Sequence, residues 1–297
     1  MFHTPPLKRL EQRLYQRLWN GSTGIFVVGN ARSGKTTALK KILRDLVDRS
    51  ERPIPSLHFT TARRDTPTVR SLQTALCEQF DVQIRARDTP AQMAKRMASH
   101  LREYAFKAGT QRVVLCIDDA HKLRIEQWDV FSEIATYLEY RPSIQLSVIS
   151  VLDAHYAQPL LNAFRSPKYS YLRGRYMNQT IDFYGIQSQR ELRSVLSAYD
   201  TLQYPADSGI SYTQMILPED FTAGWRLADQ SDLLWSVFRC RRLEGEPLAW
   251  GMQSVIDTVQ FLLLDYLAID GLKTLNESLV AHCLAEASPE YGGTRRR

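Results

Sequence analysis

The sequence predicts an α/β protein with a parallel five-stranded sheet flanked by helices, followed by a helical C-terminal lid. Three observations predict this fold class. A glycine-rich loop that fits a phosphate-binding motif lies between a β-branched run and a helical pattern. Further apolar strands alternate with helices up to about residue 187, and only helical patterns follow. Because strands that alternate with helices usually pair in parallel, the first part should form one sheet covered by helices.

The individual elements follow from local patterns of apolar and turn-forming residues. Leu7, Leu10, Leu14 and Leu18 recur at helical spacing, so residues 5–19 should form an amphipathic helix that packs on the core or on a neighbouring subunit. Strands are predicted at 24–28, 56–61, 112–117, 144–151 and 180–184. Helices are predicted at 37–47, 68–80, about 90–108, 189–199, 218–228, 231–242 and 252–267. The predicted domains are an N-terminal helix (1–19), an α/β core (20–187), a helical lid (188–287) and a flexible basic tail (288–297).

Composition favours a globular protein of the cytoplasm. The chain has 297 residues, of which 44% are hydrophobic and 24% charged, enough for a core domain plus a lid. The apolar run at 261–264 is too short to span a bilayer, so no membrane partner is expected. Four scattered cysteines without a C-x-x-C pair indicate reduced thiols. The net charge of +6 permits a polyanionic partner, and its arginine clusters favour nucleic acid.

Residues 29–36 fit the phosphate-loop motif at every fixed position and read Gly-Asn-Ala-Arg-Ser-Gly-Lys-Thr. Such a loop points its backbone N–H groups at nucleotide phosphates. Lys35 should contact the β- and γ-phosphates, and the Thr36 hydroxyl should ligate Mg²⁺. The alternative, a glycine-rich turn that matches by chance, does not account for the flanking strand and helix. The predicted ATP-binding residues are Gly29, Asn30, Ala31, Arg32, Ser33, Gly34, Lys35, Thr36 and Thr37.

The apolar strand at 112–117 ends in Asp118 and Asp119, which is the Walker B arrangement. Asp118 should hold Mg²⁺ through water, and Asp119 should orient the attacking water. Ser150, on the next predicted strand, could contact the γ-phosphate or could be a core serine bonded to the backbone. His121 has no second His or Cys at ligand spacing, so a structural role is expected for it rather than metal chemistry.

Together, these motifs resemble those of AAA+ ATPases, and within that class they resemble the TnsC/TniB family of transposition regulators. Three stretches carry the closer resemblance. Residues 65–68 read Asp-Thr-Pro-Thr before a helical pattern, and residues 117–123 read Ile-Asp-Asp-Ala-His-Lys-Leu. The third is the lid pattern Gly-Trp-Arg-Leu-Ala at 224–228, followed by Leu-Trp at 234–235 and Gly-Met at 251–252.

The resemblance implies a bacterial, DNA-associated protein that uses ATP and Mg²⁺ to form a ring or helical filament on double-stranded DNA. It would link a TniQ-like target-selection protein to a TnsB-like DDE transposase, in transposons of the kind that include CRISPR-associated ones. Hydrolysis of ATP would then disassemble the oligomer.

The resemblance also assigns roles to several arginines. Residues 171–176 (Tyr-Leu-Arg-Gly-Arg-Tyr) look like the box that carries the arginine finger, which makes Arg175 the first candidate and Arg173 the second, with Arg165 as an outside choice. Arg226 matches the lid arginine that senses the phosphates. The alternatives are a solvated arginine and a surface ion pair.

Any DNA contacts should come from dense basic positions in loops, and they should go to phosphates, so binding should depend steeply on salt. The candidates are Arg63, Arg64, Arg85, Arg87, Lys95 and Arg96, and the tail arginines 295–297 could contact DNA or be a frayed end.

Asp119 is one methylene shorter than the glutamate usual at this position, so slow ATP hydrolysis is expected. A second hypothesis is therefore an ATP-bound scaffold with little turnover. A third is another AAA+ ATPase, such as a helicase loader or a STAND-type signalling ATPase.

Overall fold

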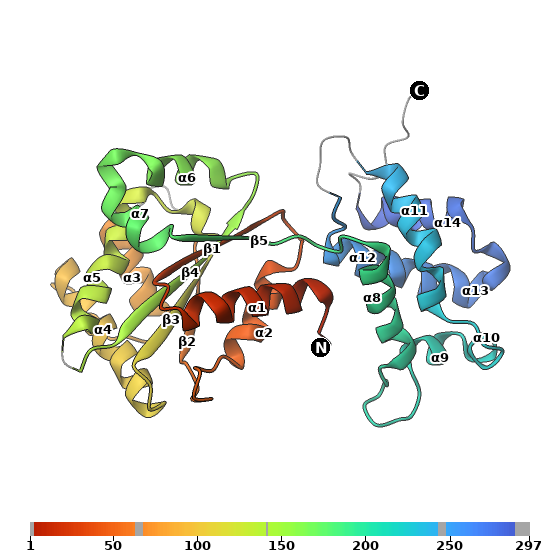
Figure 1. Cartoon of the computed structure of the whole chain (residues 1–297), viewed down its shortest axis with the longest axis horizontal. Helices are drawn as coiled ribbons and strands as arrows, with labels where there is room; N and C mark the ends of the chain where they lie inside the picture. The colour runs from red at the N-terminus through yellow and green to blue at the C-terminus, as the bar shows by residue number, and fades with distance from the viewer. Residues whose placement is uncertain (1–2, 63–67, 141, 243–247, 289–297) are drawn as a thin grey trace. The chain divides into compact units, whose positions relative to one another are not determined.

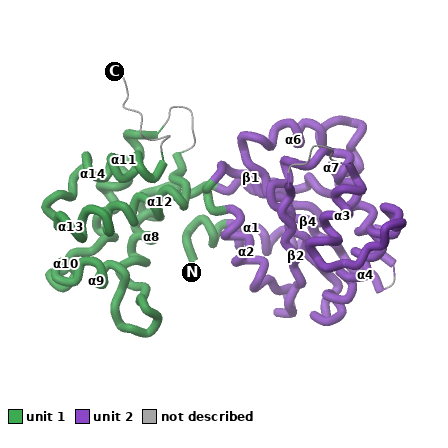
Figure 2. Tube along the Cα trace, turned by 180° about the vertical axis from the view of Figure 1, so that it is seen from behind, with its two compact units in different colours: residues 1–9, 32–34, 184–297 green, residues 10–31, 35–183 purple. Residues whose placement is uncertain are grey.

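The computed structural model describes residues 3–62, 68–140, 142–242 and 248–288. The chain divides into two compact units (Figure 2). The first comprises residues 10–31 and 35–183 and is called the sheet unit below. The second comprises residues 1–9, 32–34 and 184–297 and is called the helical unit. The sequence places the boundary between core and lid at residue 187.

The sheet unit contains one five-stranded sheet in the order β2-β3-β4-β1-β5, and each strand pairs in parallel with its neighbours (Figure 1). This confirms the predicted fold class. The strands are β1 (Gly24–Gly29), β2 (Ser56–Thr60), β3 (Arg112–Asp118), β4 (Gln145–Asp153) and β5 (Gln179–Asp182). Gly29 pairs with Asp153, and Thr60 pairs with Asp118. The carboxyl ends of four neighbouring strands therefore meet at one edge of the sheet.

The helices of the sheet unit cover both faces of the sheet. They are α1 (Pro5–Trp19), which belongs to this unit from Leu10 onward, α2 (Lys35–Arg44), α3 (Val69–Gln79), α4 (Pro90–Lys107), α5 (Asp129–Glu139), α6 (Ala157–Arg165) and α7 (Ser170–Tyr176). Figure 1 shows α3, α4 and α5 on one face and α2 on the other. Capping boxes at Thr68 and Thr89 satisfy the first N–H groups of α3 and α4, which explains where these helices begin.

The amphipathic helix α1 packs on the sheet unit through its leucines. Of the two predicted arrangements, packing on the core or on a neighbouring subunit, this is the first. Leu10, Leu14 and Leu18 are almost fully buried. Beyond them, the Trp19 indole N–H donates to the carbonyl oxygen of Val47 at 3.2 Å.

An aromatic cluster fills the sheet face that carries α3 to α7. Trp128 lies at its centre and is fully buried, with its ring centroid 4.8 Å from that of Phe164 and 5.6 Å from those of Phe26, Phe131 and Tyr176. Edge-to-face and tilted ring pairs of this kind are favourable beyond the area they bury. The cluster joins β1 to α5, α6 and α7, and it fixes the strand from which the phosphate loop departs.

The helical unit has its own core. Its helices are α8 (Gln189–Thr201), α9 (Tyr212–Ile216), α10 (Pro218–Thr222), α11 (Ser231–Arg241), α12 (Met252–Gln260), α13 (Ala268–Asp270) and α14 (Glu277–Ala287), with a π-helical segment at Phe261–Leu267. Trp235 and Trp250 are buried in it. The predicted helix at 218–228 is wrong, because α10 ends at Thr222 and the chain turns at Gly224, whose φ is +101°. A residue with a side chain rarely adopts that conformation, so glycine ends the helix here.

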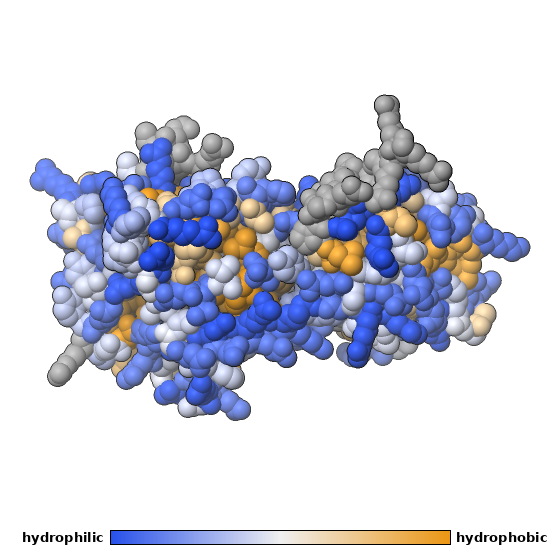
Figure 3. All heavy atoms as spheres, turned by 45° about the horizontal axis from the view of Figure 1, so that its top comes forward, coloured by the Kyte–Doolittle hydropathy of each residue, from blue (hydrophilic) through white to orange (hydrophobic). Residues whose placement is uncertain are grey.

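One stretch of the described residues, Met252–Asp270, is long and apolar enough to cross a membrane by length and composition alone. Core helices of soluble proteins pass the same test. Val255, Val259, Leu262 and Leu263 in this stretch are buried in the core of the helical unit. On the face drawn in Figure 3, hydrophilic residues cover most of the surface and apolar residues form separate patches.

Candidate nucleotide-binding site

The phosphate loop leaves β1 at Gly29 and ends at the first turn of α2. A side chain on Gly29 would meet the carbonyl oxygen of Phe183 at 2.3 Å, which explains the glycine. Gly34 has a φ of +97°, a conformation that a residue with a side chain rarely adopts. Lys35 is buried, and its Nζ donates to the carbonyl oxygens of Gly29 and Asn30 at 2.7 and 2.5 Å. The lysine therefore lies folded along the loop that should hold the phosphates.

Burial lowers the pKa of Lys35, and the carboxylates of Asp153, Asp118 and Asp119 act against this effect. The ammonium group thus lies in a partly buried site with three acidic neighbours. An anionic phosphate at this place would be stabilised by the same positive charge.

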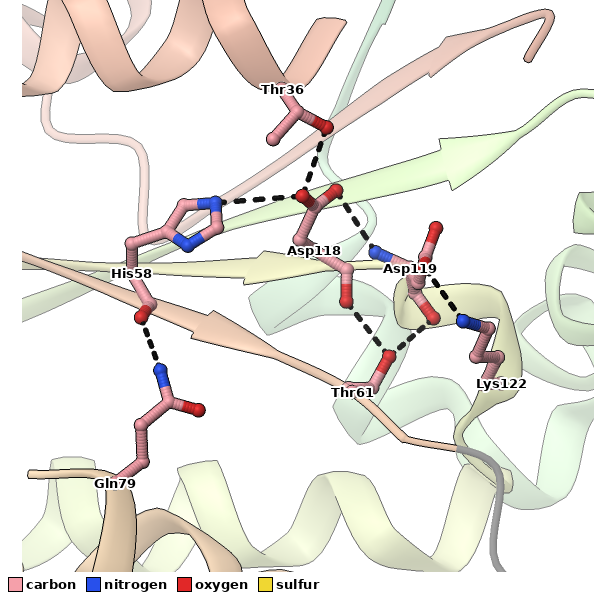
Figure 4. A network of polar contacts seen from close by, with 7 residues as sticks. All are labelled: Thr36, His58, Thr61, Gln79, Asp118, Asp119 and Lys122. Atoms are coloured by element: carbon pink, nitrogen blue, oxygen red, sulfur yellow. Dashed lines mark hydrogen bonds and ion pairs between the residues drawn. The ribbon is translucent and has the colours of Figure 1, made fainter. Parts of the chain in front are cut away.

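Asp118 is the last residue of β3, and its carboxylate faces α2 (Figure 4). Its Oδ2 accepts a hydrogen bond from Thr36 Oγ1 at 2.9 Å and lies 3.6 Å from His58 Nε2, while its Oδ1 accepts one from the Asp119 amide at 3.1 Å. Burial acts to raise the pKa of Asp118, but the contacts with His58, Thr36 and the Asp119 amide outweigh it, so the pKa lies below the usual aspartate value.

The structure therefore brings together Thr36 and Asp118, the two residues predicted to hold Mg²⁺. A hydroxyl and one carboxylate suit this ion, which in proteins usually keeps several waters and binds substrate phosphates as well. Within the described part of the chain, no group of three or more His, Cys, Asp or Glu side chains could hold a metal ion. The Thr36 hydroxyl and the Asp118 carboxylate are oxygen donors that fit a Mg²⁺ ion bound together with nucleotide phosphates.

Asp119 begins the turn after β3 in a left-handed conformation, with φ 55° and ψ 35°. Its Oδ2 accepts a hydrogen bond from Lys122 Nζ at 2.6 Å, and its side chain is 42% exposed. The carboxylate predicted to orient water is thus open to solvent and paired with a lysine of the following 3₁₀ turn (Figure 4).

Ser150, one candidate for contact with the γ-phosphate, lies instead in the core. It is buried on β4, where it pairs with Phe26 and with Ile117, the residue before Asp118. Because side chains alternate along a strand, Ser150 points to the face opposite that of Asp118. Ser150 is therefore a core serine, but its Oγ has no hydrogen-bond partner among the described residues, so the bond to the backbone expected for a core serine is not seen there.

Asp153 occupies the position that the sequence analysis gave to Ser150. It ends β4 beside Gly29, and by the same alternation its side chain lies on the face of Asp118. Its carboxylate accepts a hydrogen bond from the His155 amide at 2.9 Å. Asp153 was not among the predicted site residues, because the predicted strand ends at Val151, two residues before the observed end of β4. Its place as the last residue of the strand was the signal that could have identified it.

This arrangement of loop, lysine and strand-end aspartates agrees with a comparison to known families. Residues 20–161 match a family model described as an AAA domain. These residues form an AAA domain. The AAA domain contains the whole phosphate loop, together with Asp118 and Asp119, the two aspartates predicted to form a Walker B motif.

Solved structures of similar fold include a chain of Drosophila ORC bound to DNA, with a TM-score of 0.56 and 15% sequence identity over 98% of this chain and 71% of that chain. Cdc6p from Pyrobaculum aerophilum aligns over 98% of this chain and 81% of that chain, with 16% identity and a TM-score of 0.47. No curated protein matches the sequence. The likeness to ORC concerns the fold.

His121 connects two segments of the AAA domain that border the site. Its Nδ1 accepts a hydrogen bond from the Asp153 amide at 3.3 Å, and its ring stacks on Tyr156 with centroids 5.7 Å apart. Burial is the largest cause that lowers its pKa. These contacts agree with the structural role predicted for His121.

The arginine-finger candidates lie on α6 and α7. Arg175 donates to the Ser132 carbonyl oxygen at 3.3 Å and to Glu139 Oε1 at 3.2 Å. Arg173 is exposed on the same helix, and Arg165 donates to Asn162 Oδ1 at 3.4 Å. A finger acts on a neighbouring subunit, so its role stays a prediction for all three residues.

Arg226, the predicted lid sensor, belongs to the helical unit. Its guanidinium lies 3.7 Å from the ring centroid of Phe221 and donates to the carbonyl oxygens of Phe221 and Trp225, both at 2.7 Å. The contact of Arg226 with the nucleotide phosphates stays a prediction.

The DNA-contact candidates differ in exposure. Arg85, Arg87 and Lys95 are exposed, whereas Arg96 pairs with the buried Asp88, Nε to Oδ2 3.1 Å. Arg63 and Arg64 lie outside the described residues, as do the tail arginines 295–297. A further exposed arginine, Arg70 on α3, donates to the Ala86 carbonyl oxygen at 3.5 Å and so joins the Arg85 and Arg87 segment. We call Arg70, Arg85, Arg87 and Lys95 the basic patch.

Asp88 holds the segment that carries Arg85 and Arg87, and this predicts a pH effect on stability. The hydrogen bond from the Arg85 amide, at 2.7 Å, is the largest cause that keeps the pKa of Asp88 below its ordinary value. A group with a lowered folded-state pKa stabilises the fold above its unfolded pKa of about 3.9, and this stabilisation is lost as the pH falls through the folded-state value. Asp88→Asn should therefore lower stability at pH 7, and its difference from wild type should shrink as the pH falls through the folded-state pKa of Asp88.

Urea unfolding of Asp88→Asn and of wild type, at pH 7 and at an acidic pH below the folded-state pKa of Asp88, measures the difference in the free energy of unfolding. Asp81→Asn, which removes the charge of an exposed aspartate nearby, is the matched control and should have little effect at either pH. An Asp88→Asn deficit that stays the same at both pH values would contradict the assignment.

Proposed function

We propose that this protein is an ATP-dependent, DNA-binding regulator of transposition of the TnsC/TniB type, which assembles on double-stranded DNA when it holds ATP. One observation carries the ATP-dependent part: Thr36 Oγ1 and Asp118 Oδ2 lie 2.9 Å apart beside the phosphate loop. In the proposed cycle ATP favours a ring or filament in the cytoplasm, and this oligomer contacts a TniQ-like target selector and a TnsB-like transposase. Hydrolysis then releases it.

The chemistry of hydrolysis assigns a role to each residue. Lys35 would leave the carbonyl oxygens of the loop and neutralise charge on the β- and γ-phosphates. Thr36 and Asp118 would hold Mg²⁺, which supplies charge stabilisation to the phosphates. Asp119 would orient the attacking water. A finger from the neighbouring subunit would complete the site, and the exposed Arg173 is more available for this than Arg175, which is paired with Glu139.

Three observations support DNA binding. The basic patch places exposed Arg70, Arg85, Arg87 and Lys95 on α3, on α4 and on the segment between them. The Drosophila ORC chain of similar fold was solved bound to DNA. The stretches at 65–68, 117–123 and 224–228 resemble transposition regulators.

The test is binding to a generic DNA duplex by fluorescence anisotropy, with ATP, a non-hydrolysable analogue and ADP, at two salt concentrations. We expect tight, salt-sensitive binding with the triphosphates and weak binding with ADP. The double substitution Arg85→Ala and Arg87→Ala should weaken binding and lower the slope of log affinity against log salt by about 2, because two phosphate contacts are lost.

Arg190→Ala with Arg239→Ala is the matched control, since it removes the same charge from exposed positions of the helical unit. Equal losses in both double variants would contradict a role for the basic patch. Binding that ignores the nucleotide would leave the AAA domain in place and remove the support for ATP-gated assembly.

The second candidate is an ATP-bound scaffold with little turnover, favoured by one observation. The Asp119 side chain is one methylene shorter than the glutamate usual at this position, and its Oδ2 already accepts a hydrogen bond from Lys122 Nζ at 2.6 Å. A phosphate-release assay with DNA present separates the two functions. Turnover that needs Asp119 supports the regulator cycle, and DNA assembly without turnover supports the scaffold.

A further inference from the structure

Thr61 follows the last residue of β2 and is 2% exposed. Its Oγ1 lies 2.8 Å from the carbonyl oxygen of Asp118 and 2.7 Å from that of Asp119 (Figure 4). Its backbone N–H also donates to the Asp118 carbonyl oxygen, at 3.1 Å. One buried threonine thus contacts the backbone of both Walker B aspartates.

These contacts coincide with an unfavourable backbone conformation. Asp119 has a left-handed φ of 55°, which residues other than glycine adopt at a cost. Such conformations persist where the surrounding structure holds them in place, and they are found especially at functional sites. The Asp119 carbonyl oxygen accepts from Thr61 Oγ1 and from the Lys122 amide, the latter at 2.9 Å. The hydroxyl of Thr61 is therefore one of two donors that hold this turn.

The conformation of Asp119 decides where its carboxylate points. Rotation about φ and ψ of Asp119 would redirect its Cα–Cβ bond, while Asp118 would keep its contacts with Thr36 and His58. Without the Thr61 hydroxyl, the Asp118 carbonyl oxygen also loses one contact, but it keeps the hydrogen bond from the Thr61 amide. The change should therefore act mainly on Asp119, and the Mg²⁺-holding pair should remain in place.

We infer that Thr61 is a positioning residue for ATP hydrolysis: its hydroxyl holds the left-handed turn that aims the Asp119 carboxylate at the attacking water. This inference rests on the proposed function, because it requires turnover. It does not require DNA binding or a particular partner.

If Thr61 had a purely structural role, its substitution should have a different effect. A buried hydroxyl that only satisfies the core would, when removed, lower stability and nucleotide affinity together. A positioning role lowers kcat, while KM and Mg²⁺-ADP affinity stay close to wild type.

The test uses Thr61→Val, which keeps the shape of the side chain and removes the donor, and Thr61→Ser, which restores the donor. We expect Thr61→Val to lower kcat by roughly 10- to 100-fold, the scale of a positional error near 1 Å, with less than about a twofold change in KM. Thr61→Ser should regain most of the rate. Thr61→Ala, which keeps the backbone contact, replaces Thr61→Val if that variant does not fold.

A double-mutant cycle with Asp119→Ala shows through which group Thr61 acts. If Thr61 acts through Asp119, then Thr61→Val should cause no further loss of kcat in the Asp119→Ala background. Additive losses, a wild-type kcat in Thr61→Val, or an equal loss of nucleotide affinity would each overturn the inference. If the wild-type protein itself shows no turnover, the proposed hydrolysis fails together with the inference about Thr61. If the wild-type protein turns over ATP and only the results for Thr61→Val differ from expectation, the inference alone fails.

Discussion

Lys35→Ala is expected to lower kcat/KM for ATP by roughly 100- to 1000-fold, since removal of one preorganised donor to a charged transition state commonly has this effect. Lys35 is the buried cation of the loop, with three aspartates acting on it. Without Lys35, Arg32 is the one remaining positively charged residue in the sequence of the phosphate loop, residues 29–36. Calorimetric binding of Mg²⁺-ATP and a phosphate-release assay measure the loss.

Lys40→Ala is the control for this prediction, because it removes the same charge from an exposed position of α2. Its turnover should stay near wild type. Melting curves of both variants show whether the sheet unit remains folded. Unchanged nucleotide binding in a folded Lys35→Ala protein would contradict the assignment of the phosphate loop.

Trp128→Ala should be the most destabilising of the substitutions considered, by about 3–5 kcal/mol. The indole is fully buried and contacts four aromatic rings, from β1, α5, α6 and α7. Its removal would leave a cavity that these rigid rings can only partly fill. Urea unfolding followed by far-UV circular dichroism measures the loss without relying on the fluorescence of Trp128.

Trp128→Phe provides the matched comparison. The indole Nε1 of Trp128 is buried, and no acceptor for it lies among the described residues, so a phenyl ring should lose area but no hydrogen bond. It should cost clearly less than the alanine substitution. Tyr140→Ala, at an exposed aromatic position, should cost little. Equal stability of all three variants would show that the aromatic cluster does not support the sheet.

The sheet and the phosphate loop were predictable because their signals are local. A β-branched run before the loop, a helical pattern after it, and the spacing of Gly29, Gly34 and Lys35 are all contained in one short stretch. The place of Asp118 at the carboxyl end of an apolar strand was predictable for the same reason, while its role in a Walker B motif stays a prediction. The contact between Thr36 and Asp118 then follows from the parallel sheet, which places both strand ends at one edge.

Features that depend on register were not predictable. The predicted strand at 144–151 ends two residues before the observed end at Asp153, and this shift led to the choice of Ser150. The contact of Thr61 with Asp118 and Asp119 depends on the pairing of β2 with β3, which no local pattern encodes.

The break after Thr222 could have been predicted from Gly224, because glycine commonly follows a helix end.

The strand order also has a consequence for how the protein folds. Val27 of β1 pairs with Val151 of β4 on one side and with Ile181 of β5 on the other, and with no residue of its sequence neighbour β2. The strand that ends in the phosphate loop thus finds its hydrogen-bond partners only after most of the sheet unit has been synthesised. Such long-range pairing slows folding, because the chain must close large loops before the contacts form. A nascent chain that carried both nucleotide motifs but lacked β4 would have no strand beside β1, so nucleotide binding should arise late and mark completion of the sheet.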